Sequence, residues 1–293
     1  MKLIITADWH LRTDKPRCRV DSDWIKTQKK AVQFVFRQAE KRKASICVVG
    51  DIFDKGNDHF SILKYLLDWV FSFNTNIYIL GGNHDFIYRS MEYMDRSLFG
   101  SLFSIAVSER TNILPMAKLG CSFHCGEINE ALYDNQEIVF LHELTFSDND
   151  KTPPINTGYY LASDLLLAFP KTKWIFTGDN HHSFLYEKNN RYVINPGCLI
   201  RQAADFKDYQ TIIYFIDTET GEIEKINVPD EFSLVTDVYL EKVKERDERI
   251  SAFVSSIQEK GRVSLSFRDN LLERMKEVDK ETKEIIFECI EEI

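Results

Sequence analysis

Residues 45–54 read Ser-Ile-Cys-Val-Val-Gly-Asp-Ile-Phe-Asp, an apolar, β-branched run followed by a glycine and two acidic residues. The run predicts a buried strand over Ser45–Val49. Gly50 allows a sharp turn at the end of that strand, so the side chain of Asp51 can reach into a crevice. A carboxylate has two oxygens and can bridge two cations about 3.5–4 Å apart. This stretch therefore predicts a core strand followed directly by a ligand for a pair of metal ions.

The same pattern occurs on both sides of this stretch. Apolar runs over Lys2–Ala7 and Asn76–Leu80 predict two more strands. The first ends at Asp8-Trp9-His10, and the second ends at Gly82-Asn83-His84-Asp85. Three strands, each followed by polar side chains, therefore predict three functional loops.

Helices are expected between these strands. Apolar residues at helical spacing predict one helix over Trp24–Lys43 and another over Ser61–Phe73, with Ser61 as its expected N-cap. Alternation of strands and helices predicts parallel pairing and a layered α/β fold. In such sheets the functional loops lie at the carboxyl ends of the strands, which is where all three motifs fall.

The second half of the chain repeats the arrangement of an apolar run before a polar motif. Its predicted strands are Glu137–Leu141 before His142, Lys173–Thr177 before Gly178-Asp179-Asn180-His181, Tyr192–Asn195 and Gln210–Asp217. We expect these strands to form a second sheet packed on the first. The predicted fold class is therefore α/β, a two-sheet β-sandwich flanked by helices.

The character of the sequence changes near Val228-Pro229-Asp230. We expect a core over residues 1–229 and a small, charged helical appendage over residues 230–293. Its predicted elements are a helix over Glu241–Gln258, a link over Glu259–Arg262, a short strand over Val263–Phe267 and a helix over Asn270–Ile293. Two interpretations stay open, a solvated helical cap on the core and a docking segment for a partner protein.

The composition of the 293 residues, 44% hydrophobic and 28% charged, excludes the disordered and collagen-like classes. No apolar stretch reaches the roughly 18 residues that a membrane-spanning helix needs. The apolar N-terminal segment is too short for a signal peptide. The six cysteines are scattered without a paired framework, which indicates free thiols and a cytoplasmic protein that does not associate with membranes.

The net charge of −9 argues against a grip on nucleic acid by the whole surface. Cations are nevertheless concentrated in the loop after the first motif: Arg12, Lys15, Arg17 and Arg19. This loop adjoins the expected site, so its cations could contact phosphates beside a scissile bond. The alternative is a solvated basic loop.

The residue types of the motifs suit hard divalent cations and proton transfer. Asp8 and His10 are two residues apart at a strand end and could share one metal. Asn83 offers a neutral carbonyl oxygen, whereas the neighbouring His84 could face the substrate. Asp85 could hydrogen-bond to His84 or hold the loop.

Taken together, the motifs resemble those of the calcineurin-like metallophosphoesterase superfamily. Within it, Asp8-Trp9-His10-Leu11, Gly50-Asp51-Ile52-Phe53-Asp54 and Asn195-Pro196-Gly197-Cys198 are similar to the SbcD-type branch, a repair exonuclease subunit of bacteria and many phages. Arg201 and Ala203-Ala204-Asp205 behind the last of these add to that similarity. The resemblance covers roughly residues 1–216.

The resemblance implies two metal ions and a proton donor. It places one metal on Asp8, His10, Asp51 and His181, and the other on Asp51, Asn83, His142 and Asp179. It makes His84 the proton donor, with Asp85 beside it. Arg201 would join the basic loop in binding substrate.

One motif departs from the family pattern. The family usually has Gly-His-x-His, whereas this chain has Gly178-Asp179-Asn180-His181. A carboxylate is a harder ligand than imidazole, so Asp179 would favour Mn²⁺, with Mg²⁺ as the second choice. A shifted register that uses His182 is the alternative.

The resemblance implies a Mn²⁺-dependent DNA exonuclease or endonuclease acting in DNA repair, recombination or phage DNA metabolism. DNA, an SbcC-like coiled-coil ATPase docked on the C-terminal helices, and a second copy of the chain are the implied partners. Two other interpretations stay open. One is a phosphodiesterase or phosphatase on nucleotides or small phosphoesters, and the other is a non-catalytic interaction module, which would be expected to lack ligands.

Overall fold

The computed structural model describes residues 1–108, 111–123, 136–149, 158–232, 234–259, 271, 275 and 278–291.

A six-stranded sheet contains the N-terminal strand. In spatial order its strands are β13 (Glu222–Asn227), β12 (Ile212–Asp217), β1 (Lys2–Thr6), β2 (Ser45–Val49), β3 (Ile77–Leu80) and β4 (Ile113–Pro115). Strands β1 to β4 pair in parallel, whereas β12 pairs antiparallel with both β1 and β13.

A five-stranded sheet contains the other strands that were predicted to precede metal ligands. In spatial order they are β10 (Phe184–Lys188), β11 (Arg191–Asn195), β9 (Trp174–Thr177), β6 (Ile138–Leu141) and β5 (Cys121–Phe123). A small parallel pair, β7 (Thr145–Phe146) and β8 (Tyr160–Leu161), lies apart from it. The prediction for Gln210–Asp217 is corrected in one respect, because β12 pairs with β1 in the first sheet.

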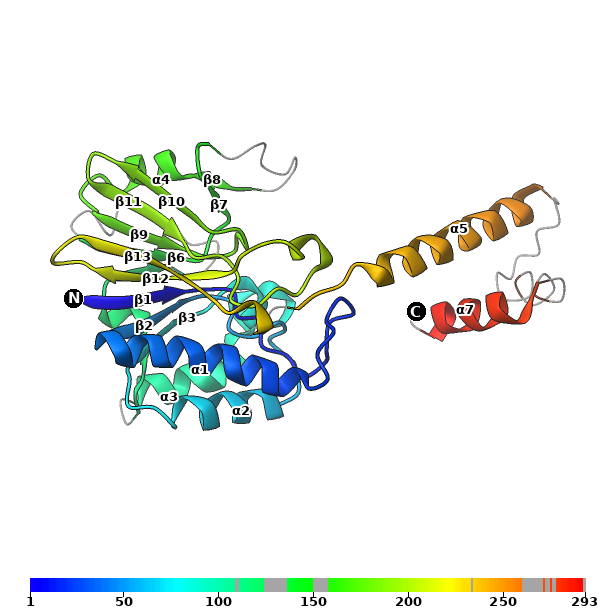
Figure 1. The fold of residues 1–293 in the computed structure, drawn as a ribbon, viewed down its shortest axis with the longest axis horizontal. Coiled ribbons are helices and arrows are strands. Elements are labelled where there is room, and N and C mark those ends of the chain that lie inside the picture. The colour runs from blue at the N-terminus through cyan, green and yellow to red at the C-terminus, as the bar shows by residue number, and fades with distance from the viewer. Residues whose placement is uncertain are drawn as a thin grey trace. The chain divides into compact units, whose positions relative to one another are not determined.

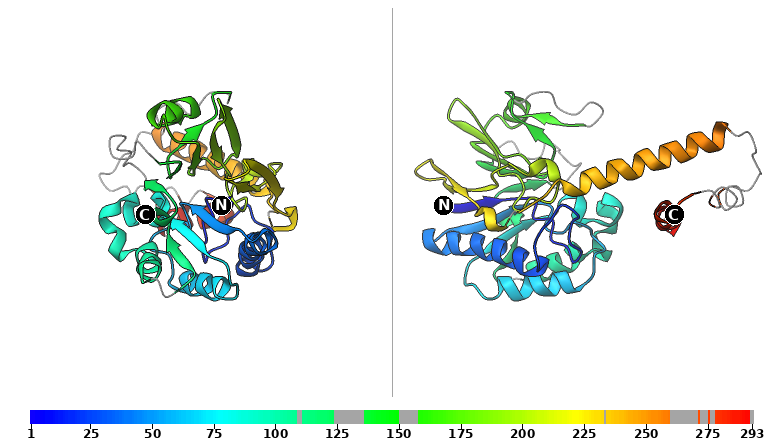
Figure 2. Two further views of the ribbon diagram at one scale, coloured as in Figure 1. Left: turned by 90° about the vertical axis from the view of Figure 1, so that its left-hand side faces the viewer. Right: turned by 45° about the vertical axis from the view of Figure 1, so that its right-hand side comes forward.

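Helices cover the outer faces of both sheets, as Figures 1 and 2 show. Three of them lie on the first sheet: α1 (Trp24–Arg42), α2 (Ser61–Val70) and α3 (Leu98–Val107). The second sheet carries α4 (Ala162–Ala168). The layers therefore run helix, sheet, sheet, helix, and the predicted fold class is confirmed.

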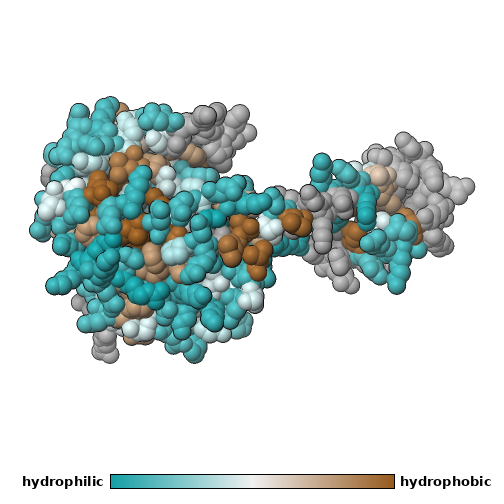
Figure 3. Space-filling model, in the orientation of Figure 1, coloured by the Kyte–Doolittle hydropathy of each residue, from teal (hydrophilic) through white to brown (hydrophobic). Residues whose placement is uncertain are grey.

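Period-two alternation along the strands explains this layering. Ile4 of β1 faces the helices, whereas its neighbours Leu3 and Ile5 face the other sheet. In β6, Phe140 points into the space between the sheets and Val139 points toward α4. Strands covered on both faces read as continuous apolar runs, which is the pattern the sequence shows. On the face of the two-sheet part that Figure 3 shows, hydrophilic residues predominate and the apolar residues form separate patches.

Two predicted helix ends need correction. Helix α2 has Phe60 at its N-cap position, and Ser61 is already its first helical residue. Nδ1 of His59 accepts a hydrogen bond from the backbone N–H of Ser61 at 3.2 Å, so a histidine ring takes the place of the predicted serine cap. The helix ends at Val70, three residues before Phe73.

The chain divides into two compact units after Val235. Phe232 packs in the core of the first unit, so the segment just after residue 229 belongs with that unit. The second unit contains α5 (Val238–Glu259) and α7 (Lys280–Glu291), with a small apolar cluster that includes Met275 and Ile286.

Some predictions for this second unit were wrong or are untested. The chain bends at Val278, so the helix predicted over Asn270–Ile293 is not continuous. Most of the predicted link over Glu259–Arg262 and the whole predicted strand over Val263–Phe267 lie outside the described residues. None of the helices in the described ranges is long and apolar enough to cross a membrane.

Lys43 ends α1 in a left-handed conformation, with φ of 53°, while its N–H bonds to the carbonyls of Ala39 and Glu40. Replacing Lys43 with glycine should raise the free energy of unfolding by about 0.5–1 kcal/mol, because glycine adopts positive φ without a steric cost. Urea denaturation measures the change. The matched control is Lys41→Gly inside the last turn, which should lower stability by about 1 kcal/mol. Destabilisation by both substitutions would contradict this account of the cap.

Candidate metal centre

The motif loops of both sheets meet at the carboxyl ends of their strands. Backbone hydrogen bonds align the loops after β1 and β2: Asp8 N–H donates to the carbonyl of Gly50 at 3.2 Å, and His10 N–H donates to that of Asp51 at 3.0 Å. In the second sheet, Gly178 N–H donates to the carbonyl of Leu141 at 3.0 Å. Residues far apart in the sequence are thereby brought to one place.

Four of the predicted ligands have a strained backbone. Their φ values are 48° for Asp8, 44° for His10, 50° for Asp51 and 73° for Asp179. A non-glycine residue in this left-handed region costs of order 1–3 kcal/mol and persists only where surrounding structure imposes it. Such residues concentrate at functional sites, so the strain marks these four independently of their chemistry.

Three glycines allow side chains to fill the centre. A Cβ on Gly50 would lie 1.9 Å from His142 Nδ1, and one on Gly82 would lie 2.2 Å from Asp51 Oδ1. A Cβ on Gly178 would lie 2.2 Å from the carbonyl oxygen of Val49. Real Cβ atoms do not approach other atoms this closely, so glycine is required at all three positions.

The carboxylate of Asp51 lies in the middle of the centre and is fully buried. Its Oδ2 is 3.6 Å from His10 Nε2 and 3.3 Å from His142 Nε2. One carboxylate oxygen therefore lies within reach of two imidazoles that come from different sheets.

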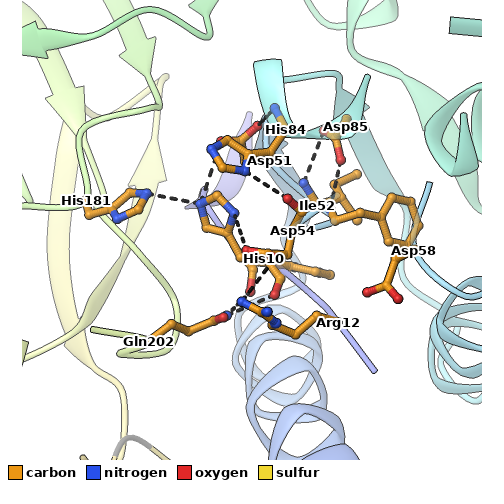
Figure 4. A network of polar contacts seen from close by, with 12 residues as sticks. His10, Arg12, Asp51, Ile52, Asp54, Asp58, His84, Asp85, His181 and Gln202 are labelled. Atoms are coloured by element: carbon orange, nitrogen blue, oxygen red, sulfur yellow. Dashed lines mark hydrogen bonds and ion pairs between the residues drawn. The ribbon is translucent and has the colours of Figure 1, made fainter. Parts of the chain in front are cut away.

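One set of ligand atoms lies around His10. Asp8, His10 and His181 present ligand atoms within 4.8 Å of one another. The Nε2 atoms of His10 and His181 face each other at 3.0 Å, and Figure 4 shows the ring of His10 between those of His181 and His84. Two imidazole nitrogens directed at one another are well placed to bind a shared cation.

The other set lies around His142. Its Nδ1 donates to the carbonyl of Val49 at 2.9 Å, which leaves Nε2 directed at the centre. Asp179 Oδ1 is 3.8 Å from this Nε2 and accepts a hydrogen bond from Asn83 Nδ2 at 3.0 Å. The amide oxygen of Asn83 remains available as a ligand.

Unpartnered buried atoms show that these residues fit a metal pair. Asp8 Oδ2, Asp51 Oδ2, Asn83 Oδ1 and His142 Nε2 are buried without a hydrogen-bond partner. Burying such atoms unpaired costs about 1–3 kcal/mol each, and more for charged groups. All four are oxygen or imidazole donors, the chemistry that divalent cations bind.

A family model described as calcineurin-like phosphoesterase matches residues 1–214. The chain belongs to the calcineurin-like phosphoesterase family. This assignment makes it a phosphoester hydrolase by family, and divalent metal ions are the cofactors typical of such proteins. No curated protein matches the sequence.

Several solved structures are similar to this phosphoesterase. TT1561 of Thermus thermophilus is 11% identical, with 78% of this chain and 99% of that chain covered and a TM-score of 0.46. A novel archaeal phosphodiesterase is 17% identical, with coverage of 78% and 99% and a TM-score of 0.38. GAP50, the anchor in the inner membrane complex of Plasmodium, is 10% identical, with coverage of 78% and 89% and a TM-score of 0.43.

Electrostatics in this phosphoesterase favour the ligand forms of three residues. Burial lowers the pKa of His10 and of His181, which keeps both imidazoles neutral. Burial alone would raise the pKa of Asp51, but the charge and hydrogen bond of His142 beside it lower that pKa below its usual range. Neutral imidazoles and an ionised carboxylate are the states that bind metal.

His84 is held by a backbone carbonyl. Its Nδ1 bonds to the carbonyl of Asp54 at 2.8 Å, so the Nδ1 proton is held there and Nε2 is free to exchange a proton. The carboxylate of Asp54 forms an ion pair with Arg12 at 3.0 Å. Asp54 therefore orients His84 through its carbonyl and Arg12 through its carboxylate.

Asp85 holds the loops together through its carboxylate. Its carboxylate accepts hydrogen bonds from the N–H groups of Gly82, Phe53 and Ile52 at 2.9, 2.7 and 3.2 Å. Burial, with Asp51 nearby, raises the pKa of Asp85. Of the two roles considered for this residue, the structure has the second, and Asp85 is a positioning residue.

The predicted substrate-binding cations divide into two groups. Arg12 lines a pocket together with Gln202, Phe206, His10 and His181. Lys15 and Arg17 are exposed on the same loop as Arg12. Arg19 is only 3% exposed and donates to the carbonyls of Arg201 and Phe232. The structure therefore contradicts a substrate role for Arg19.

Arg201 is also structural. It is 7% exposed, donates to the carbonyl of Lys207 at 2.8 Å and forms an ion pair with Asp230. These partners hold the segment near residue 230 against the core. A guanidinium so engaged does not reach substrate, which corrects the prediction for Arg201.

Two further residues near the centre complete the comparison with prediction. His182 packs its ring against Phe206 at a centroid distance of 4.5 Å. Neither His182 nor Asp179 belongs to a potential metal group of the described residues, but Asp179 Oδ1 lies 3.8 Å from His142 Nε2, which favours the register with Asp179. Gln202, which no motif had indicated, donates from Nε2 to the carbonyls of His10 and Trp9. No spacing signal marks a glutamine that bonds to backbone 192 residues away.

Gly82→Ala should lose bound metal, because the new Cβ would displace Asp51 Oδ1. Elemental analysis of the purified protein after dialysis measures the stoichiometry, and circular dichroism checks the fold. Gly158→Ala is the matched control, because a Cβ at Gly158 meets nothing within 4 Å. Full metal content in the Gly82 variant would refute the close packing described for Asp51.

Proposed function

We propose that this phosphoesterase is a two-metal phosphodiesterase that cleaves DNA. The observation that carries the proposal is the position of Asp51 Oδ2, within 3.6 Å of His10 Nε2 and 3.3 Å of His142 Nε2. A carboxylate oxygen between two imidazoles of separate ligand sets suits a bridge between two cations.

The proposed ligands are Asp8, His10, Asp51 and His181 for one ion, and Asp51, Asn83, His142 and Asp179 for the other. When bound, the ions would lower the pKa of a water toward neutrality and neutralise charge on the phosphoryl oxygens. We propose Mn²⁺ in preference to Mg²⁺, because the set mixes carboxylate and amide oxygens with three imidazoles.

His84 is the proposed proton donor. Its Nδ1 is held by the carbonyl of Asp54, so a proton on Nε2 can pass to the leaving oxygen. His84 has a second possible role as a metal ligand, because the ligand atoms of His84, His10 and Asp51 lie within 4.8 Å of one another. The two roles are separable, because a ligand's loss lowers metal content and a proton donor's loss does not.

Cations near the site support a polyanionic substrate. Arg12 lies in the pocket beside His10 and His84, and Arg17 is exposed on the same loop. Phosphate contacts from arginine position a nucleic acid without reading its sequence. The likeness of the motifs to the SbcD-type branch supports DNA as the polymer.

A small phosphodiester is the second candidate substrate. Arg12 is paired with both Asp14 and Asp54, which neutralises much of its charge. The net charge of −9 also disfavours polyanions away from the site. Hydrolysis of a model phosphodiester without DNA cleavage would select this candidate.

The second unit, Thr236–Ile293, is proposed as the docking segment for an SbcC-like coiled-coil ATPase. Val238 and Val254 of α5 are exposed apolar residues on a charged helix. Isolated exposed apolar residues are common on protein surfaces, so co-purification with such an ATPase is the required test.

End-labelled single- and double-stranded DNA should be digested with Mn²⁺ present and left intact with chelator. His84→Ala should lower turnover at least about 100-fold with metal content unchanged, because general acid catalysis typically contributes 10²–10⁴-fold. His59→Ala, at an exposed histidine in none of the potential metal groups of the described residues, is the control. Normal turnover, or loss of metal, in the His84 variant would remove His84 from this role.

Removing the charges of Lys15 and Arg17 together should weaken DNA binding and reduce the slope of log K against log salt by roughly 2, because each phosphate contact contributes about 0.9. Fluorescence anisotropy at several salt concentrations measures both effects. The matched control removes two exposed cations on α1, Arg37 and Lys41. An unchanged slope for the loop variant would show that the basic loop is merely solvated.

A further inference from the structure

A second cleft adjoins His84 on the side away from the metal ligands. It has a volume of about 230 Å³ and lies between the loop of residues 54–57 and the loop of residues 84–89. The pocket at the metal centre shares only Asp54 and His84 with it. A substrate whose scissile bond lies beside His84 would therefore extend into this cleft with one of its two fragments.

The walls of the cleft are fixed by close packing. A Cβ on Gly56 would lie 2.6 Å from the carbonyl carbon of Phe86, so the two loops touch through their backbones. Gly56 also accepts a hydrogen bond from the N–H of Leu98 at 2.8 Å. Phe86 is buried edge-on against Phe99 at a ring distance of 5.7 Å. The cleft is thus a preformed feature of the fold.

An exposed tyrosine lines the cleft on a strained backbone. Tyr88 is 83% exposed, and both Tyr88 and Arg89 have φ of 55°. Two consecutive non-glycine residues in the left-handed region carry a steric cost that local packing must offset. The ring of Tyr93 meets that of Tyr88 edge-on at 5.3 Å, which orients Tyr88 and leaves it open to solvent.

Two cations line the same cleft as this ring. Lys55 and Arg89 both line the cleft and are exposed. Within the part of the chain that the structure describes, neither forms an ion pair, whereas Arg12 on the other side of His84 forms two. Lys55 and Arg89 are therefore the cations near His84 that remain available to a phosphate.

We propose that this cleft is a nucleotide subsite for the leaving fragment, where Tyr88 stacks on an unpaired base and Lys55 and Arg89 contact the next phosphate. The proposal rests on the proposed nuclease function and adds a substrate class to it. Stacking on an aromatic ring requires an unstacked base and is tolerant of sequence. The subsite therefore selects single-stranded DNA or a frayed end, without preference for a particular base.

The leaving side follows from the position of His84. Its Nε2 is the proposed proton donor to the leaving oxygen, and the cleft begins at this histidine and contains none of the proposed metal ligands. The fragment that departs with its oxygen protonated is thus the one that occupies the cleft.

A dinucleotide cycle tests the subsite. The substrates are thymidine dinucleotide and two analogues in which one or the other nucleoside is an abasic tetrahydrofuran unit. Wild-type protein should lose roughly tenfold in kcat/KM for one of the two analogues, because stacking of a base contributes about that much. Tyr88→Ala should have the same kcat/KM for the intact dinucleotide and for that abasic analogue, and its value for the analogue should equal that of the wild type. Tyr88→Phe should keep the difference between the two substrates.

Further variants and outcomes complete the test. Arg89→Ala should raise KM for substrates that carry one more phosphate on the leaving side, whether or not the base that stacks on Tyr88 is present. Tyr159→Ala, at another exposed tyrosine, is the control and should behave as wild type. Equal losses for Tyr88→Ala with and without the base would overturn the subsite and leave the nuclease proposal standing. Hydrolysis of a small phosphodiester without cleavage of any dinucleotide or DNA would overturn the nuclease proposal, and the subsite with it.

Discussion

The buried carboxylate of Asp51 is the constraint on which the rest of the centre depends. An ionised group without solvent is costly unless hydrogen bonds and opposite charge compensate it. The N–H of His84 at 2.9 Å supplies one bond to Oδ1, and two imidazoles face Oδ2. These compensations require the left-handed turn at Asp51 and the missing side chain at Gly82. The position of a single buried carboxylate thus depends on the backbone conformation at Asp51 and on glycine at position 82.

Packing between the two sheets maintains this geometry. The first sheet supplies Asp8, His10, Asp51 and Asn83, and the second supplies His142, Asp179 and His181. Neither proposed ligand set is complete within one sheet, so the distance between the sheets sets the distance between the proposed ligands. Phe140, Trp174 and Phe176 fill that space with stacked rings, and close-packed interiors resist small displacements. The apolar core and the polar centre are therefore parts of one arrangement.

Charge on the protein is distributed so that attraction to anions is local. The whole chain is acidic, yet Arg12 lies on one side of His84, and Lys55 and Arg89 lie on the other. Cations on both sides of the proposed proton donor suit a substrate that continues past the scissile bond in both directions. Acidity elsewhere limits unspecific adhesion to polyanions, because like charges repel beyond the short range of these contacts.

Local patterns in the sequence sufficed for the strands that precede the motifs and for the glycine turn before Asp51, because alternation and strand-end chemistry depend on near neighbours. They also indicated which residue types could hold metal. Tertiary structure alone decided that Arg19 is buried against a carbonyl 182 residues away and that Asp85 holds two loops together. It alone formed the open cleft between the loop of residues 54–57 and the loop that carries Tyr88. Burial and partners at such separations arise from chain packing, which no local spacing encodes.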